Sequence, residues 1–491
     1  MNNQKSTINL FSFSKQSKML HLSWMAFFIS FLVWFNHAPL MAIIREQLGL
    51  SHQEVATILI LNVALTIPAR VVIGMFVDRF GPRLVYALLL FISAFLCFGF
   101  ALANSFETLA LFRFLLGFSG AGFVIGIRLI SEWFPAKTVG LAEGIYGGWG
   151  NFGSAAAAMI LPFVALYIGG DNGWRYAVAM TGVLALVYSL YFYRVARNTP
   201  RGATYFKPKK SGAMEISSKA DLYLYVVMKL PLFLALALLT WKLSPLNLNM
   251  LSGGVCTGIY IGLLAAFLYQ VYHIYEVNKI VFGQGVADIQ RYSFKQVALL
   301  SLAYMVTFGS ELAVVSMLPL YYMDLFGLSA IVAGLIAASF AIMNLIARPV
   351  GGLVSDRFGR KKTLIIFLFG LAIGYYIMSL MTSQWNIVLV LLATVFCAFF
   401  VQAGCGAVFA HVPLIKRRMT GQISGMVGAY GNVGGVCLLT LYSFVSAATF
   451  FLFIGASSLI LMVLILIFMN EPVGHMAEVL EDGSVELIKV G

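Results

Sequence analysis

Two arginines stand at matching places in two copies of one motif. The stretches 70–81 and 348–359 both read Arg-x3-Gly-x3-Asp-Arg-Phe-Gly, and each follows a long apolar run. On a helix the first arginine lies about 12 Å from its Asp-Arg turn at ~1.5 Å per residue, inside the ~30 Å hydrocarbon core of a bilayer. Ionisable groups at that depth are costly and usually functional. Arg70 and Arg348 are therefore the predicted centre of the functional site.

Two guanidinium groups that face one cavity attract a small anion. The planar, bidentate fork of arginine suits a carboxylate, a phosphate or another planar oxyanion. Polar and small residues recur every four positions around each arginine, which predicts a wet face towards a central cavity. These residues are Asn62, Thr66 and Gly74 beside Arg70, and Asn344 and Gly352 beside Arg348. The alternative is that each arginine pairs structurally with a neighbouring helix.

A second repeat lies further along each half of the chain. The stretches 140–153 and 421–434 both read Gly-x3-Gly-x2-Gly-x-[Trp/Tyr]-Gly-Asn-x-Gly, at a shift of 281 residues from 140 to 421. The repeats predict two parallel copies of six helices with a substrate site between them near the bilayer midplane. The glycines fit either tight helix packing or a site. Asn151 and Asn432 favour a site, because an amide in hydrocarbon needs a partner.

The composition predicts an all-α polytopic membrane protein. Hydrophobic residues make up 61% of the 491, charged residues 10%, and the mean hydropathy is +0.91. The net charge of +13 does not indicate nucleic acid, because the lysines and arginines gather in alternate short loops, as the positive-inside rule requires. Both termini are therefore predicted to be cytoplasmic.

Other classes of function find little support in the sequence. The five cysteines lie in apolar runs without Cys-x-x-Cys spacing, so they are predicted to be buried hydrophobes rather than disulfides or metal ligands. The chain has no His-Glu-x-x-His, phosphate-cradling loop or nucleophile elbow. We predict no enzymatic activity, no metal and no cofactor.

Fourteen apolar segments are predicted. They are 22–42, 55–76, 83–104, 108–134, 138–168, 175–195, 221–241, 254–275, 296–323, 330–353, 363–383, 386–411, 421–443 and 447–470. We divide the chain into a cytoplasmic N-terminus (1–21), an N-terminal six-helix half (22–197), a basic linker with two extra hydrophobic segments (198–295), a C-terminal six-helix half (296–470) and an acidic, solvated cytoplasmic tail (471–491). Lys229 and Pro231 weaken the first extra segment, so the extra pair either spans the membrane or forms interfacial or re-entrant helices.

Several other charged residues have predicted roles. Glu311 follows Tyr304 and Phe308 at helical spacing, and it either carries a proton or forms a structural ion pair. The turns Asp78-Arg79 and Asp356-Arg357 are predicted to latch neighbouring helices at the cytoplasmic ends. Arg128 and Glu132 are four residues apart and are predicted to pair, whereas Arg113 is predicted to snorkel.

Taken together, the motifs resemble a known family. Gly74-x3-Asp78-Arg79-x-Gly81 and its copy resemble the cytoplasmic signature of the major facilitator superfamily. The mid-helix arginines and the two Gly-Asn signatures resemble the nitrate/nitrite porter family within it, and most of all the cyanobacterial-type permeases. The resemblance implies that Arg70 and Arg348 clamp nitrate. It also implies contacts to the ion from Asn151, the Gly147 backbone, Tyr304 and Asn432, and an aromatic sandwich of Phe123 and Phe308.

Two departures from the family bear on the mechanism. His37 stands where some relatives carry an aromatic residue, and Glu311 stands where some bacterial exchangers are apolar. Two cations around one monovalent anion leave about one uncompensated charge, which a symporter returning empty must neutralise. Glu311, with His37 as a second candidate, therefore favours proton-coupled uptake of nitrate and nitrite across the cytoplasmic membrane by a monomer in the lipid bilayer. The alternatives are nitrate/nitrite exchange, transport of another small anion such as a carboxylate, or a non-transporting nitrate sensor.

Overall fold

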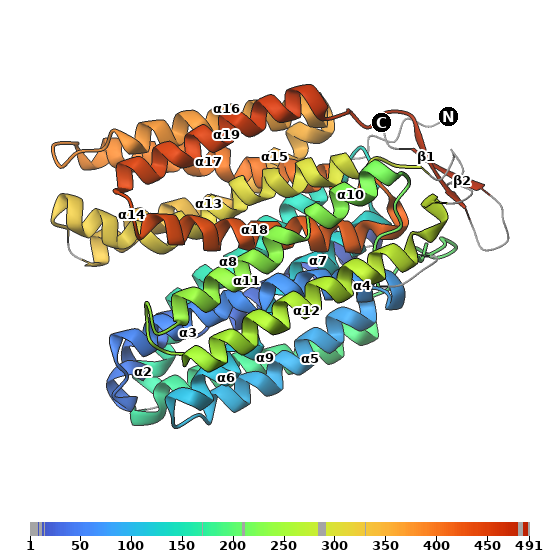
Figure 1. Ribbon diagram of the computed structural model, residues 1–491. Helices are drawn as coiled ribbons and strands as arrows, with labels where there is room; N and C mark the ends of the chain where they lie inside the picture. Colours follow the sequence, from blue (N-terminus) through green and yellow to red (C-terminus); the bar gives the residue numbers. More distant parts are fainter. Residues whose placement is uncertain are drawn as a thin grey trace.

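The computed structural model describes residues 8, 12–13, 15–168, 170–208, 212–282, 291–328, 330–479 and 485–489. Two helical bundles, one from each half of the chain, lie side by side with their helices running in the same general direction (Figure 1). Within the described residues, fourteen helical segments are long and apolar enough to cross a membrane. This confirms the predicted all-α membrane architecture.

The N-terminal bundle is built from α1 to α9. The bounds are α1 Lys15–Phe35, α2 Met41–Leu48, α3 His52–Ala64, α4 Thr66–Phe80, α5 Pro82–Ala101, α6 Phe106–Leu116, α7 Gly122–Trp133, α8 Val139–Ile168 and α9 Gly173–Val195. Short 3-10 turns join or interrupt helices in the part of this region that the structure describes: η1 Ala38–Leu40, η2 Gly117–Ala121, η3 Gly170–Asn172 and η4 Lys279–Phe282.

The C-terminal bundle is built from α13 to α19. The bounds are α13 Phe294–Phe326, α14 Ala330–Ile342, α15 Asn344–Phe358, α16 Arg360–Ser379, α17 Ile387–His411, η6 Val412–Leu414, η7 Arg417–Met419, α18 Thr420–Tyr442 and α19 Ala447–Phe468. Two antiparallel strands, β1 His475–Val479 and β2 Val485–Lys489, follow α19. They lie at the end of the bundle where α1 begins (Figure 1). We call this the basic end, because α4 and α15 finish there in the turns that carry Arg79 and Arg357.

The structure differs from the predicted boundaries at both ends of the chain. The first helix begins at Lys15, seven residues before the predicted apolar segment, because a helix extends beyond its apolar stretch into the basic end. The tail was predicted as a solvated segment, and the structure adds that β1 and β2 pair there as a hairpin. Glu471 is also bound, since its carboxylate accepts hydrogen bonds from the backbone of Arg360 and Lys361 at 2.7 and 2.8 Å.

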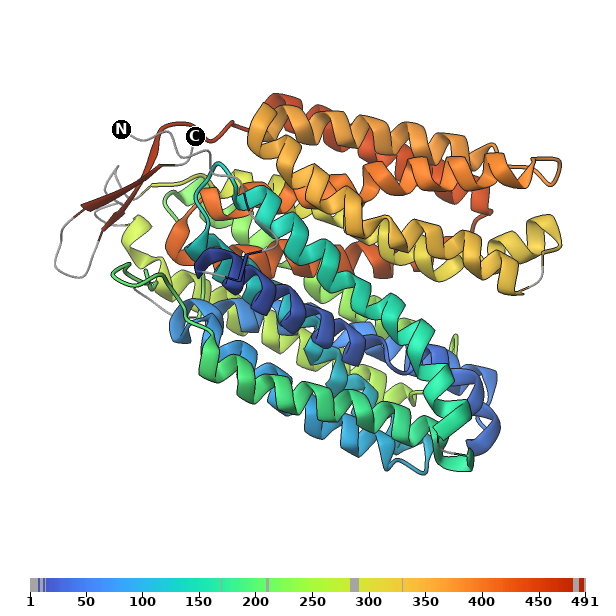
Figure 2. The same ribbon diagram turned by 180° about the vertical axis from the view of Figure 1, so that it is seen from behind.

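The extra segments lie on one side of the seam between the bundles. They form α10 Lys219–Val227, α11 Leu230–Leu243 and α12 Gly253–Val277. α11 contacts both α3 of the N-terminal bundle and α18 of the C-terminal bundle. α12 lies outside α11, on the face of the molecule seen in Figure 1, and among the described residues the face seen in Figure 2 has no such covering helix. Both segments are long and apolar enough to cross a membrane, and they run along the bundle.

Glycines let the two bundles approach each other along two pairs of helices. A Cβ on Gly74 of α4 would lie 2.2 Å from the carbonyl oxygen of Gly421 on α18. In the matching pair, a Cβ on Gly144 of α8 would lie 2.5 Å from the carbonyl oxygen of Arg348 on α15. No side chain fits at these distances, so the glycine repeats serve helix packing over most of their length.

Candidate functional site

Arg348 reaches from the C-terminal bundle to the N-terminal one. Its Nη2 donates to Oε2 of Glu311 on α13 at 2.8 Å. When the Asn151 amide oxygen faces it, that oxygen accepts from Nη1 and Nη2 at 3.0 Å each. Asn344 donates to the other oxygen of Glu311 at 2.7 Å. Arg348 is only 2% exposed, so its ion pair with Glu311 is buried within the C-terminal bundle, and its contact with Asn151 is the one that crosses the seam.

Arg70 reaches in the opposite direction with different partners. Its Nε donates to the carbonyl oxygen of Gly120 at 3.2 Å, and its Nη1 donates to that of Gly428 on α18 at 2.7 Å. The side chain is fully buried, and no carboxylate pairs with it within the described residues. The positive charge of Arg70 is therefore compensated only by neutral dipoles.

Broken helices provide the backbone acceptors around Arg70. The 3-10 turn η2 interrupts the helix between α6 and α7, and the helix between α3 and α4 breaks at Leu65. The interruption frees carbonyl groups: Gly117 accepts from the hydroxyl of Thr66 at 2.6 Å and Gly120 accepts from Arg70. Irregular backbone at membrane depth is tolerated where it lines a site between helices.

Two glycines of the second repeat admit the arginines. A Cβ on Gly147 would lie 3.4 Å from Nη1 of Arg348, and a Cβ on Gly428 would lie 3.5 Å from Nη1 of Arg70. The two positions correspond at the 281-residue shift, so each half supplies the glycine that faces the other half's arginine. The asparagines of the same repeat are used differently. Asn151 binds Arg348, whereas both side-chain atoms of fully buried Asn432 lack a partner within the described residues.

Aromatic rings surround the guanidinium groups. The ring of Phe308 lies 5.3 Å from the Arg70 guanidinium carbon and 5.4 Å from that of Arg348, so it contacts both cations. Tyr304 stacks on Phe308 at 4.9 Å with 5° between the planes. Phe123 lies parallel to Tyr304 at 6.2 Å and approaches Arg70 at 5.8 Å. The structure thus brings all the predicted aromatic residues to the arginines.

His37 and Arg113 lie in a separate buried cluster. Arg113 is fully buried, and it donates to the amide oxygens of Asn36 and Asn62 and to the carbonyl oxygen of Trp34. The prediction that Arg113 snorkels is wrong, because three acceptors, from the end of α1, the turn after it and α3, hold its guanidinium inside. His37 is buried beside Arg113, and its Nδ1 has no partner in the described structure. Asn62 belongs to this cluster rather than to the face that carries Arg70.

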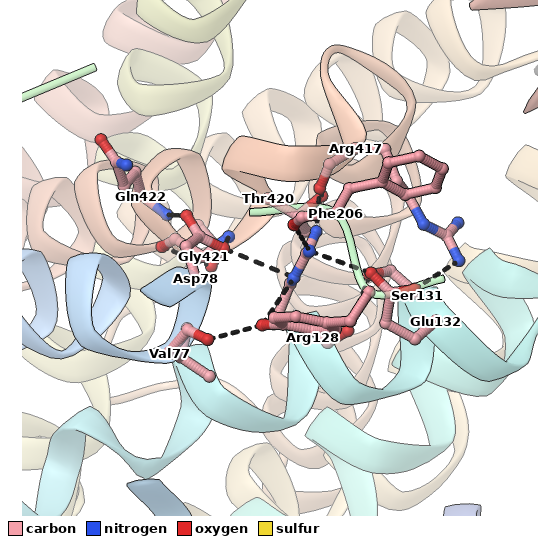
Figure 3. A network of polar contacts seen from close by, with 12 residues as sticks. Val77, Asp78, Arg128, Ser131, Glu132, Phe206, Arg417, Thr420, Gly421 and Gln422 are labelled. Carbon is pink, nitrogen blue, oxygen red and sulfur yellow. Dashed lines mark hydrogen bonds and ion pairs between the residues drawn. The ribbon is translucent and has the colours of Figure 1, made fainter. Parts of the chain in front are cut away.

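The two repeated aspartates join the halves at the basic end. Asp78 accepts hydrogen bonds from the backbone N–H groups of Gly421 and Gln422 at 2.8 Å each, at the start of α18 (Figure 3). Asp356 does the same for Gly140 and Leu141 of α8 at 3.1 and 2.9 Å. Each carboxylate therefore caps a helix of the opposite half and compensates the positive end of its dipole.

The cations that accompany these aspartates are not the adjacent arginines. Arg79 and Arg357 point outwards and are exposed. Fully buried Arg128 lies 3.4 Å from Asp78 and 3.0 Å from Glu132, which confirms the predicted Arg128–Glu132 pair (Figure 3). Arg360 takes the corresponding place beside Asp356 at 3.2 Å. Both turns end in glycines with φ of 87° and 96°, Gly81 and Gly359, so the helices stop there.

Comparisons with known proteins show the family of the chain. The Major Facilitator Superfamily model matches residues 23–287 and 300–488. The chain is 43% identical to "Nitrate/nitrite transporter NrtP" of Nostoc punctiforme, over 97% of both chains, and 44% identical to the protein of that name in Picosynechococcus sp., again over 97% of both. The chain belongs to the nitrate/nitrite porter family of the major facilitator superfamily.

Solved structures show that the porter has the fold of this superfamily. The proton:xylose symporter XylE superposes with a TM-score of 0.60 at 16% identity, covering 93% of this chain and 97% of its own. The human organic anion transporter MFSD10 superposes with a TM-score of 0.62 at 12% identity, covering 92% and 100%. At these identities the likeness concerns the fold alone.

Sequence reasoning missed several groups at the site of this porter. The carbonyl oxygens of Gly120 and Gly428 carry no side-chain signal, and Cys405, whose sulfur lies 3.7 Å from Glu311, looked like an ordinary apolar residue. Tyr205 of the linker donates to the carbonyl oxygen of Val77 and accepts from Arg128. Only the position of Tyr205 in a basic linker between halves could have drawn attention to it.

Proposed function

We propose that this porter takes up nitrate and nitrite across the cytoplasmic membrane by alternating access, coupled to protons. Two relatives that match nearly the whole chain carry the name nitrate/nitrite transporter. The observation that carries the proposal is the pair of buried arginines, each of which reaches from its own half to the other. Because one chain supplies both arginines, a monomer is sufficient for transport. The lysine and arginine distribution supports a cytoplasmic position for the basic end.

Nitrate fits between the two halves as a planar anion with three acceptor oxygens. Arg70 provides the uncompensated charge and Arg348 the second guanidinium, and Phe308 contacts both. The unpartnered amide of Asn432 offers a further donor, since a buried N–H without a partner is costly until a ligand binds it. Tyr304, Phe123, Asn151 and the Gly147 backbone complete the walls of the site.

Coupling to protons follows from the ion pair of Glu311. Glu311 neutralises Arg348 in the structure, which leaves Arg70 as the one uncompensated cation among the three charges. A nitrate that binds Arg348 displaces Glu311, and the displaced carboxylate then takes up a proton. Nitrate and proton together add no net charge to the buried site. The total charge of the site is therefore the same with and without substrate, so the two halves can close around it in both states.

Glu311→Gln in proteoliposomes tests this coupling. Glutamine keeps the shape and one acceptor oxygen but cannot carry a proton, so uphill nitrate accumulation driven by a pH gradient should be lost. Exchange of labelled for unlabelled nitrate should persist. Glu107→Gln, a change of an exposed acid at the start of α6, is the matched control and should behave like the wild type.

Normal pH-driven accumulation by Glu311→Gln would exclude Glu311 as the proton carrier. Exchange without accumulation in the wild-type protein would indicate a nitrate/nitrite exchanger instead. Binding without any flux would indicate a sensor, and competition by carboxylates or phosphate would indicate a different anion.

A further inference from the structure

Glu143 is a buried acid that the anion site does not use. It lies on α8 four residues before Gly147 and eight before Asn151, so it shares their helix face about 6 and 12 Å nearer the basic end. It is 2% exposed, and neither carboxyl oxygen has a hydrogen-bond partner within the described structure. The adjacent Gly144 packs against the backbone of Arg348 on α15, which places Glu143 in the contact between the halves.

The charges around Glu143 are already balanced without it. Three arginines and three carboxylates pair at the basic end: Arg128 with Asp78 and Glu132, Arg417 with Glu132 at 3.5 Å, and Arg360 with Asp356. The charged groups that act on Glu143 are Asp356 of α15, Arg360 of α16 and Arg417 of η7, with Tyr146 on its own helix and His411 of α17 beside Arg360. Glu471 also acts on Arg360, so Glu143 adds a further acid to a network whose three arginines already have acidic partners.

The duplicated half shows that packing does not require an acid here. The 281-residue shift places Ser424 of α18 at the position of Glu143, and its hydroxyl donates to the carbonyl oxygen of Gly421 at 3.0 Å. A serine thus fills the same place in the equivalent contact with the N-terminal half. Only one half therefore carries a carboxyl group at this position. Burial of that group costs free energy, because no hydrogen bond within the described structure compensates for its lost hydration.

We call the contact between the two halves at the basic end, where Asp78 caps α18 and Asp356 caps α8, the gate. We propose that Glu143 is a proton-binding site in this gate, which binds a proton when the gate is closed and releases it when the gate opens. An unpaired buried carboxylate costs far more than a neutral carboxylic acid, so closure selects the protonated form. When the halves part, water reaches the carboxyl group, its O–H bond breaks and the proton passes to cytoplasmic water. Closure reverses the step with a proton from the same side, so the full cycle moves no net proton through Glu143.

This site makes the gate sensitive to cytoplasmic pH. Acidification favours the closed gate, so uptake that carries protons inwards would slow itself as the cytoplasm acidifies. Asp356 acts in the opposite sense, because its ionised form is the one that caps α8. The inference rests on the alternating access proposed above but not on the identity of the anion.

The test is the pH dependence of gate opening in purified full-length protein without nitrate. Spin labels at Lys137 and Lys362, exposed residues of opposite halves, report the distance across the basic end in a Cys437→Ser background. Release of one proton on opening changes the ratio of open to closed protein by up to about tenfold per pH unit. Relative to wild type, Glu143→Gln should lose this contribution and stay closed at high pH. Ser424→Ala, the matched control, should keep the wild-type dependence.

The outcomes separate the inference from the proposed function. An unchanged pH dependence in Glu143→Gln overturns the proton site, and Glu143→Ser, which installs the residue found at 424, gives the same decision if the glutamine variant does not fold. A smaller number of protons carried per nitrate by Glu143→Gln also overturns it, since Glu143 would then carry transported protons, whereas slower uptake at the wild-type ratio is expected of a gate that stays closed. Failure of wild-type protein to transport nitrate would refute the proposed function while the gate measurement still stands.

Discussion

The two arginines occupy equivalent positions in the two halves but differ in their partners. Arg348 is bound by a carboxylate and an amide, whereas Arg70 is bound by two backbone carbonyl oxygens. Duplication therefore preserved the position of the cation and changed its electrostatic state. In the function proposed above, the N-terminal half supplies the charge that attracts an anion, and the C-terminal half supplies the cation whose release of Glu311 couples the anion to a proton.

Because the two arginines have different partners, removing each one should lower the free energy of unfolding by a different amount. Arg348→Ala leaves Glu311 buried and unpaired, which should cost about 3–5 kcal/mol. Arg70→Ala leaves two carbonyl oxygens without a donor, which should cost about 1–3 kcal/mol. Thermal unfolding in detergent measures both, and Arg348→Ala should lower the Tm further.

A double variant gives the control for this comparison. Arg348→Ala with Glu311→Ala removes both members of the pair, so it should recover much of the stability lost in the single variant. Equal losses for Arg70→Ala and Arg348→Ala, with no recovery in the double variant, would show that the two arginines have the same environment.

The repeats explain why the centre of the site could be predicted and much of its surroundings could not. Arg70, Arg348 and the glycines that face them belong to motifs whose spacing survives duplication, so the sequence alone brings them together. The choice between a proton carrier and an ion pair for Glu311 stayed open, because its distance from Arg348 depends on packing between α13 and α15. The structure shows the ion pair between Glu311 and Arg348. Whether Glu311 also carries a proton is tested by nitrate accumulation in the Glu311→Gln variant.

Long-range contacts account for the other differences. Asp78 was predicted to latch a neighbouring helix, but no local pattern indicates that its partners are the backbone N–H groups 343 and 344 residues further along. The prediction for Arg113 was wrong for the same reason, since Asn36 lies in the turn after α1 and Asn62 lies on α3. The strands β1 and β2 went unrecognised because their residues look like an acidic, solvated tail.

The glycines that face the arginines should give the smallest effects. In Gly428→Ala the new Cβ would meet Cδ of Arg70 at 3.3 Å, and in Gly147→Ala it would meet Nη1 of Arg348 at 3.4 Å. Each change should raise the KM for nitrate by a few-fold, on the order of 1 kcal/mol, without loss of folding. The effect should be greater for Gly428→Ala, because Arg70 has no carboxylate to hold it in place.

Gly334→Ala is the matched control for these variants. A Cβ at Gly334 meets nothing within 4 Å, so nitrate uptake should match that of the wild type. A greater loss in Gly147→Ala than in Gly428→Ala would contradict the assignment of Arg70 as the less constrained arginine.

Nitrate uptake by Arg70→Lys and Arg348→Lys in proteoliposomes tests the central claim most directly. Lysine keeps the charge but loses the planar fork, so bidentate binding of one anion by both halves requires arginine at each position. The account predicts that each single variant loses at least about tenfold in initial rate at low nitrate concentration, on the order of 1.4 kcal/mol or more. Unchanged uptake in both variants would contradict it.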